Sequence, residues 1–161
     1  MSAAPALTVV LRPEEAGDDA FLCELYATTR EQELSIVPWS EDERRAFCDS
    51  QSRIQRLAYR GQFPSADFDV ILVDGRPAGR LAVDRTEDDI HVIDIALLPE
   101  HRGQGTGSSL LTHLVEEADR NGRSVSLHVE RTNPAWRLYE RLGFRAVGEA
   151  GLSVLMRWSG A

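Results

Sequence analysis

The chain has 161 residues, of which 42% are hydrophobic and 27% charged, and this length and composition predict one globular domain over residues 1–161. Its 18 basic and 26 acidic residues give a net charge of −8, which argues against a nucleic-acid partner because phosphate backbones bind basic surfaces. The sequence has no run of about 20 apolar residues that could cross a membrane. Its first apolar run, residues 7–11, is too short for a signal-peptide core. We therefore expect a cytoplasmic protein that does not associate with membranes.

Cysteine and histidine are few and scattered. Cys23 and Cys48 cannot form a disulfide framework, and both lie in segments of helical periodicity, so we expect free, buried thiols in a reducing compartment. The four histidines and two cysteines do not fall at metal-ligand spacing. The sequence therefore predicts no metal site.

The chain is predicted to begin with a strand and a helix. Residues 7–12 are rich in β-branched and apolar side chains, and Pro13 ends this strand. Asp18 or Asp19 can then cap a helix that runs to about residue 30.

A second helix is predicted after a break over residues 28–39. Ser40 is a good N-cap, and Glu43 stands three residues later, as a capping box requires. The helix is expected over residues 41–60, with Gly61 just beyond it.

Three strands follow. Residues 69–73 and 78–83 are β-rich and are joined by residues 74–77 (Asp-Gly-Arg-Pro), which indicates a hairpin. Residues 90–98 are almost continuously apolar, as in a central strand covered on both faces. Asp94 interrupts this run, and a carboxylate there must be paired or functional.

The last third of the chain alternates between helix and strand. Residues 106–119 have helical periodicity, and residues 124–130 alternate as a strand does. Asn133 is expected to cap a short helix with Pro134 at its first position. Two final strands, residues 144–147 and 152–158, are expected to pair antiparallel. The predicted order, β-α-α-β-β-β-α-β-α-β-β, belongs to the α/β (mixed α+β) class, with a mixed sheet and helices on both faces.

The sharpest motif lies between the apolar strand and the helix that begins at residue 106. It consists of Arg102, Gly103, Gln104, Gly105, Thr106 and Gly107. Glycines allow several backbone N–H groups to point at one spot, and the helix N-terminus adds its unsatisfied amides and dipole. This pattern predicts a pyrophosphate site, in which Arg102 either contacts the phosphate or braces the loop. A P-loop would need a lysine after the glycines, and a dinucleotide fingerprint would need glycine where Ser108 stands.

At these residues the sequence resembles the GNAT superfamily of acyl-CoA-dependent N-acyltransferases. The pyrophosphate signature of that family, Gln/Arg-x-x-Gly-x-Gly/Ala, is matched by Arg102, Gly105 and Gly107. A second landmark, an Asn upstream of Leu-Tyr-x-x-x-Gly-Phe, is matched by Asn133 and residues 138–144, although the interval is one residue shorter than in many members. The resemblance covers essentially the whole chain.

The resemblance implies a GNAT-type mixed, mostly antiparallel sheet of six to seven strands, flanked by about four helices. It also implies acetyl-CoA as cosubstrate, no metal, and direct transfer to a primary amine in a ternary complex. The strands over residues 90–98 and 124–130 would splay apart and admit pantetheine. Backbone amides near Leu97 and Leu98, together with Asn133, would then contact the pantetheine arm.

The resemblance also implies candidate catalytic residues. Tyr139 matches the family tyrosine that acts as general acid toward the leaving thiolate. The base stays open between His128, whose ordinary pKa of about 6.5 suits the task, Asp94, His91 and an ordered water.

The acceptor is a small-molecule amine or a protein or peptide amine, and the sequence does not choose between them. The first two helices are expected to hold it, with Arg30, Glu31, Glu33 and Trp39 as wall residues. A homodimer also stays open, since dimers are common in the family. The alternatives in function are a non-catalytic acyl-CoA-binding or sensing module on the same fold and a nucleotide-binding enzyme.

Overall fold

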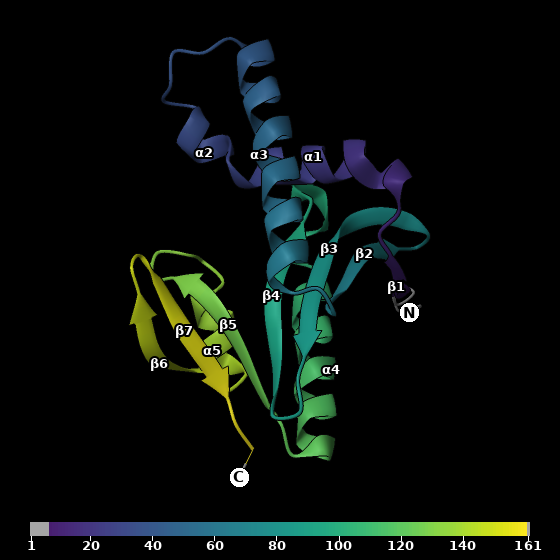
Figure 1. Ribbon diagram of the computed structural model, residues 1–161, viewed down its shortest axis with the longest axis vertical. Coiled ribbons are helices and arrows are strands. Elements are labelled where there is room, and N and C mark those ends of the chain that lie inside the picture. The colour runs from purple at the N-terminus through teal and green to yellow at the C-terminus, as the bar shows by residue number, and fades with distance from the viewer. Residues whose placement is uncertain (1–6, 161) are drawn as a thin grey trace, which may run out of the picture. The chain divides into compact units, whose positions relative to one another are not determined.

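The structure is a computed structural model that describes residues 7–160 (Figure 1). Within these residues it has seven strands, five α-helices and two 3-10 helices. The strands are β1 (Val9–Pro13), β2 (Asp67–Val73), β3 (Arg76–Arg85), β4 (Asp89–Leu97), β5 (Ser124–Glu130), β6 (Arg145–Ala150) and β7 (Ser153–Trp158). The helices are η1 (Ala16–Asp18), α1 (Asp19–Thr29), α2 (Glu31–Leu34), α3 (Glu41–Gln62), η2 (Pro99–His101), α4 (Thr106–Asn121) and α5 (Trp136–Arg141).

The strands form one mixed sheet in the order β1-β2-β3-β4-β5-β7-β6. The pairs β1–β2, β5–β7 and β6–β7 are antiparallel, whereas β4 and β5 run parallel. The expected mixed, mostly antiparallel sheet of six to seven strands is thus confirmed. The helix count exceeds the expected four by α2.

The chain divides into two compact units. The first unit runs to Leu81 and includes Ile95–Arg102, and the second comprises Ala82–Asp94 and the chain from Gly103 onward. The strands β3 and β4 each pass from one unit into the other. The expectation of one domain over residues 1–161 stays a prediction.

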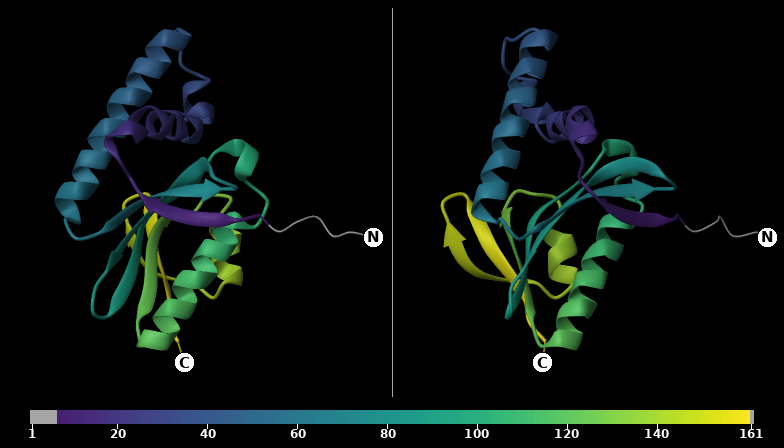
Figure 2. Two further views of the ribbon diagram at one scale, coloured as in Figure 1. Left: turned by 90° about the vertical axis from the view of Figure 1, so that its right-hand side faces the viewer. Right: turned by 45° about the vertical axis from the view of Figure 1, so that its right-hand side comes forward.

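In the first unit, α1 crosses α3, as both views of Figure 2 show. The capping box at the start of α3 is confirmed: the Glu43 amide donates to Ser40 Oγ at 3.1 Å, and the Ser40 amide donates to Glu43 Oε1 at 3.3 Å. Cys23 and Cys48 are buried, free thiols, as expected.

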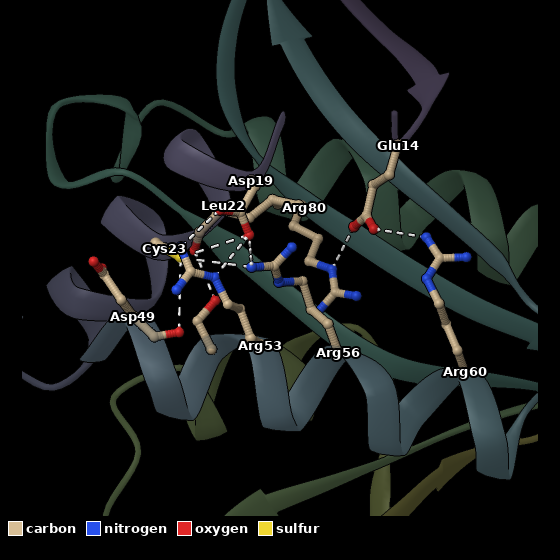
Figure 3. Close-up of polar contacts among 10 residues, drawn as sticks. Glu14, Asp19, Leu22, Cys23, Asp49, Arg53, Arg56, Arg60 and Arg80 are labelled. Carbon is tan, nitrogen blue, oxygen red and sulfur yellow. Dashed lines mark hydrogen bonds and ion pairs between the residues drawn. The ribbon is translucent and has the colours of Figure 1, made fainter. Parts of the chain in front are cut away.

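Two carboxylates fasten α3 to the rest of the first unit (Figure 3). Asp19, at the start of α1, accepts hydrogen bonds from Arg53 at 2.9 Å and from Arg56 at 2.7 Å. Both guanidinium groups hold the pKa of Asp19 well below its ordinary value. The carboxylate therefore stays ionised, and the link persists over the whole physiological pH range.

Glu14 makes the second connection. Its Oε1 accepts from Arg80 Nε at 2.6 Å, and its Oε2 accepts from Arg60 at 3.0 Å (Figure 3). The side chains of Glu14 and Arg80 are both only 4% exposed, so this ion pair lies in the interior. All 18 basic residues of the chain are arginines, whose planar guanidinium suits such paired contacts.

Gly79 allows β3 and the end of β4 to approach closely within the first unit. A Cβ atom at this position would lie 2.1 Å from the Ala96 carbonyl oxygen and 2.8 Å from Leu97 Cδ2. Such distances are far inside van der Waals contact, so only glycine fits here. This contact fixes the backbone just before the glycine-rich turn.

In the second unit, β5, β7 and β6 lie side by side (Figure 1), and α4 contacts β5. The two predicted final strands form the antiparallel pair β6–β7. The prediction for the preceding helix was wrong in detail, because α5 begins at Trp136 with Ala135 as N-cap. Instead of capping the helix, Asn133 Oδ1 accepts from the Ala135 amide at 2.9 Å, and this local turn delays the helix.

Two further local predictions also need correction. The predicted break over residues 28–39 contains α2, which good helix formers and the ion pair between Arg30 and Glu33 at 2.9 Å stabilise. The hairpin turn consists only of Asp74 and Gly75, whose φ angles are +50° and +81°. Pairs of positive φ angles make the tight turns that suit two-residue hairpins, so β3 resumes already at Arg76. None of the helices within residues 7–160 is long and apolar enough to cross a membrane.

Candidate active site

The glycine-rich motif forms the turn between η2 and α4. Gly103 and Gly105 have φ angles of +73° and +84°, a conformation that L-residues with side chains rarely adopt. Gly105 is the N-cap of α4, and its carbonyl accepts from the Ser109 amide at 2.9 Å. The glycines are therefore required by the path of the backbone into the helix.

The geometry of this turn suits an anion. The first amides of α4 have no acceptor within the helix, and the positive end of the helix dipole lies at Gly105. A Cβ atom built on Gly103 or Gly105 would meet none of the described atoms within 4 Å, so space beside the turn is open. The residues present thus fit a pyrophosphate group.

Arg102 makes two hydrogen bonds within the first unit. Its Nε donates to the Leu97 carbonyl at 2.9 Å, and its Nη2 donates to Thr28 Oγ1 at 3.4 Å. The Leu98 amide donates to the Ala78 carbonyl at 2.8 Å. The expectation that the Leu98 amide is free for a ligand therefore does not hold in this structure, because a strand contact uses it.

Tyr139 lies in the second unit on α5, with its side chain buried. The residue is 7% exposed, and its ring lies 5.9 Å from that of Phe144. Burial raises the pKa of Tyr139, and the negative charge of Asp94 raises this pKa further. The hydroxyl thus keeps its proton at neutral pH, as a general acid must. Asp94 is half-buried on β4, so the structure brings these two predicted site residues into electrostatic contact.

His128 lies on β5, exposed, opposite Leu155 of β7. Its ring meets that of His91 edge-on, with centroids 5.5 Å apart and planes at 72°. The structure therefore associates His128 with His91 and Asp94 with Tyr139. Asn133 is exposed and has its side-chain oxygen committed to the turn before α5.

Sequence reasoning missed two residues beside the histidine pair. Ser126 lies on β5 directly opposite His91 in the parallel ladder, and its Oγ is 2.9 Å from His91 Nδ1. Asp89 accepts from Ser126 Oγ at 2.5 Å and from Ser124 Oγ at 2.7 Å. The alternation of Ser124, Ser126 and His128 was visible in the sequence, but the register that matches it to β4 was not.

The expected acceptor wall lies in the first unit. Arg30 donates to the Tyr26 hydroxyl at 3.1 Å and pairs with Glu33. Trp39 is 36% exposed and packs edge-on against Phe47, with ring centroids 5.2 Å apart. The first unit also has a cavity of about 430 Å³, lined in part by Arg53, but the carboxylates of the same lining already bind its arginines.

The family model of the acetyltransferase (GNAT) family matches residues 20–144, which is more than half of the chain. The chain belongs to the GNAT family. The match includes the glycine-rich turn, the histidine pair and Tyr139, and it confirms the resemblance seen in the sequence.

Two bacterial GNAT relatives share a name for their activity. One is a Bacillus subtilis (strain 168) protein named as a ribosomal protein bS18-alanine N-acetyltransferase by inference. It is 37% identical over 87 residues, which are 53% of this chain and 58% of that protein. The ribosomal protein bS18-alanine N-acetyltransferase of Escherichia coli (strain K12) is 29% identical over 116 residues, 71% of this chain and 69% of that enzyme. This chain thus spans somewhat more than half of the length of the first relative.

Solved GNAT structures have the same fold. The PaiA N-acetyltransferase of Thermoplasma acidophilum in complex with coenzyme A aligns with a TM-score of 0.70 at 16% identity, over 95% of this chain and 99% of that one. An acetyltransferase of Thermus thermophilus aligns with a TM-score of 0.67 at 17% identity, over 95% and 97% of the two chains. Among residues 7–160, no group of three or more His, Cys, Asp or Glu side chains is arranged to hold a metal ion.

Proposed function

We propose that this GNAT protein transfers the acetyl group of acetyl-CoA directly to a primary amine, with the N-terminal amine of a protein as the acceptor. The observation that supports it best is Tyr139, a buried tyrosine whose pKa is raised, in the same unit as an open glycine turn at a helix N-terminus. A proton donor and a pyrophosphate site are the two features that thioester transfer from coenzyme A demands.

The proposed roles follow the order of the reaction. The amides of residues 103–107 hold the pyrophosphate, and Arg102 keeps the loop in shape. His128 removes a proton from the acceptor ammonium, the amine nitrogen bonds to the acetyl carbon, and the carbon–sulfur bond breaks. The departing thiolate takes the proton of the Tyr139 hydroxyl, which Asp94 keeps protonated beforehand. The nitrogen loses its second proton as the amide forms, this proton restores the Tyr139 hydroxyl through solvent, and His128 returns its proton to solvent.

The acceptor class comes from the relatives. Both are named for acetylating an alanine amine of ribosomal protein bS18, so a protein N-terminus is the first acceptor to test. The net charge of −8 suits a cationic amine acceptor, since opposite charge raises encounter rates. A small-molecule amine is the second acceptor class.

A thiol-release assay tests the proposal. Acetyl-CoA is offered with a peptide that begins with alanine, the same peptide with a blocked N-terminus, and a panel of small amines and polyamines. We expect thiol release with the free peptide and its loss with the blocked one, and mass spectrometry locates the acetyl group. Turnover only with small amines would exclude the protein acceptor.

The non-catalytic alternative predicts a different result. A sensing module would be stabilised by acetyl-CoA in thermal unfolding but would release no thiol with any acceptor. A nucleotide-binding enzyme would be stabilised by ATP or NAD instead. The same protein sample therefore distinguishes the three functions.

A further inference from the structure

A chain of three polar side chains joins β4 to β5 beside the histidine pair. Asp89 accepts from Ser126 Oγ at 2.5 Å, and Ser126 Oγ lies 2.9 Å from His91 Nδ1. Ser126 is only 2% exposed, so water does not compete freely for its hydroxyl. All three residues sit in the four-residue parallel ladder that joins the two strands.

The direction of the hydrogen bonds follows from the number of available protons. An ionised Asp89 can only accept, so it takes the single hydroxyl proton of Ser126. Ser126 Oγ can then only accept from the imidazole, and His91 must donate through Nδ1–H. A neutral His91 consequently carries its lone pair on Nε2, and one tautomer is selected.

Burial, more than any neighbouring charge, favours the neutral form of His91. Burial lowers the pKa of His91 below its ordinary value, and the neighbouring His128 lowers this pKa further. Asp89 on the same strand and Asp84 on β3 act in the opposite direction but do not outweigh the first two causes. The His91 ring is therefore uncharged at neutral pH and contacts the ring of His128 edge-on.

We propose that His91 is a positioning residue for the base: Ser126 and Asp89 fix its tautomer and its ring, the ring orients His128, and protonation of His91 stops His128 from working. The inference rests on the proposed function, in which His128 takes the proton of the acceptor ammonium. An imidazolium at His91 would place a positive charge 5.5 Å from the ring that must accept this proton and would repel the cationic acceptor. Acetyl transfer itself keeps the proton balance given above, because His91 exchanges protons only with solvent.

Two serines provide a matched pair of variants. Ser126→Ala and Ser124→Ala each remove one hydrogen bond to Asp89, but only Ser126 contacts His91. In ¹H–¹⁵N spectra of the imidazole groups, we expect S126A to lose the single Nδ1–H form of His91 and S124A to keep it. We expect kcat to fall about tenfold in S126A, because a misoriented base loses its reactive geometry, and to change less than about twofold in S124A. Equal behaviour of the two variants in both measurements would overturn the inference.

A pH profile separates positioning from a merely structural role. His91→Asn keeps a donor for Ser126 but cannot take up a proton, whereas His91→Phe keeps a ring against His128 but loses the donor. In a plot of the logarithm of kcat/KM against pH, the acidic limb should have a slope one unit steeper in the parent than in either variant. Only the parent can take up a second proton that inhibits the reaction. At pH 8, H91N and H91F should each lower kcat, since H91N lacks the ring that contacts His128 and H91F lacks the donor for Ser126. Acidic limbs of equal slope in all three proteins would contradict the inference.

Failure of the proposed function would give a different pattern. If the protein is not an acetyltransferase, no variant releases thiol, yet the tautomer of His91 still responds to S126A and not to S124A. If the protein acetylates amines but His91 does not position the base, thiol release occurs with identical acidic limbs. The spectra thus test the hydrogen-bond chain, and the kinetics test its use.

Discussion

The two units of this protein use charged groups for opposite purposes. In the first unit, Asp19 and Glu14 are bound by arginines, which never lose their charge in water. In the second unit, Asp89 and Ser126 lead by hydrogen bonds to His91, an imidazole whose pKa burial and the neighbouring His128 lower. Both networks are polar and connected, but the second includes an imidazole that takes up a proton as the pH falls.

This difference suggests that the charged groups of the first unit serve stability, whereas the polar groups of the second unit serve the reaction. A buried ion pair such as Glu14–Arg80 contributes to holding helices and strands in place. A neutral imidazole, a serine and a buried tyrosine with a raised pKa are groups suited to acid and base work. Changes in the first unit should therefore alter unfolding, and changes in the second should alter turnover.

The largest expected effect is on stability and comes from Glu14→Ala. Removing this carboxylate takes away one of the groups that bind the buried Arg80 guanidinium, and breaking a buried pair costs about 3–5 kcal/mol of unfolding free energy. The control Arg60→Met removes only the exposed partner, for which we expect less than about 1 kcal/mol. Chemical denaturation measures both. Equal losses in the two variants would show that burial of the pair does not matter.

The complementary change in the second unit is Tyr139→Phe. The phenyl ring keeps the packing against Phe144 but cannot protonate the thiolate, so kcat for thiol release should fall at least about 100-fold. Thermal unfolding and the affinity for coenzyme A should stay nearly as in the parent. A variant that releases thiol at the parental rate would remove Tyr139 from the chemistry.

Gly105→Val should weaken cofactor binding by a smaller factor. A β-branched residue at a φ of +84° is strained by about 1–2 kcal/mol, so the turn should open and the affinity for coenzyme A should drop roughly tenfold. Gly61→Ala is the control, because this glycine lies in α3 with a negative φ and open space. Calorimetric titration measures both affinities, and an unchanged value for G105V would place the pyrophosphate elsewhere.

Asp94→Asn should shift a pH profile and leave the fold intact. The negative charge of Asp94 raises the pKa of Tyr139, so its removal lowers this pKa. The general acid then loses its proton at lower pH, and the alkaline limb of kcat should move toward neutral pH. An alkaline limb that does not move would mean that Asp94 acts on another group.

The smallest expected effect is on acid stability. The depressed pKa of His91 means that its contribution to stability is present above the ordinary value of about 6.5 and is lost as the pH falls through the depressed one. The arginines beside Asp18 and Asp19 lower the pKa of these carboxylates, so their contribution is lost only below about pH 4. The free energy of unfolding, measured between pH 7 and pH 3, should thus fall in two stages. His91→Asn should abolish only the first of these stages.

Local signals predicted much of the fold. The capping box of Ser40 and Glu43 acts within one helical turn, and the start of α3 was predicted correctly at Glu41. The glycines at 103 and 105 favour positive φ angles, so the tight turn into α4 was also predicted. Such features depend on residues a few positions apart, which a single sequence displays.

The register between β4 and β5 was not predicted. The hydrogen bonds that link Asp89, Ser126 and His91 form because β4 and β5 run parallel in one register. The sequence of either strand alone does not determine that register. Asn133 has the composition of a helix cap, but its side chain closes a turn two residues on, and both uses are compatible with the same sequence. The contacts of His91 and Asn133 therefore needed the three-dimensional structure.

The all-arginine character of the first unit has a consequence for a protein that handles an activated acetyl donor. A thioester modifies free amines even without catalysis, and an acetylated lysine would lose its charge and release its carboxylate partner. Because all 18 basic residues are arginine, the contacts made by Asp19 and Glu14 are immune to this damage. Acetyl-CoA therefore cannot neutralise a lysine side chain anywhere within these 161 residues, because they contain none.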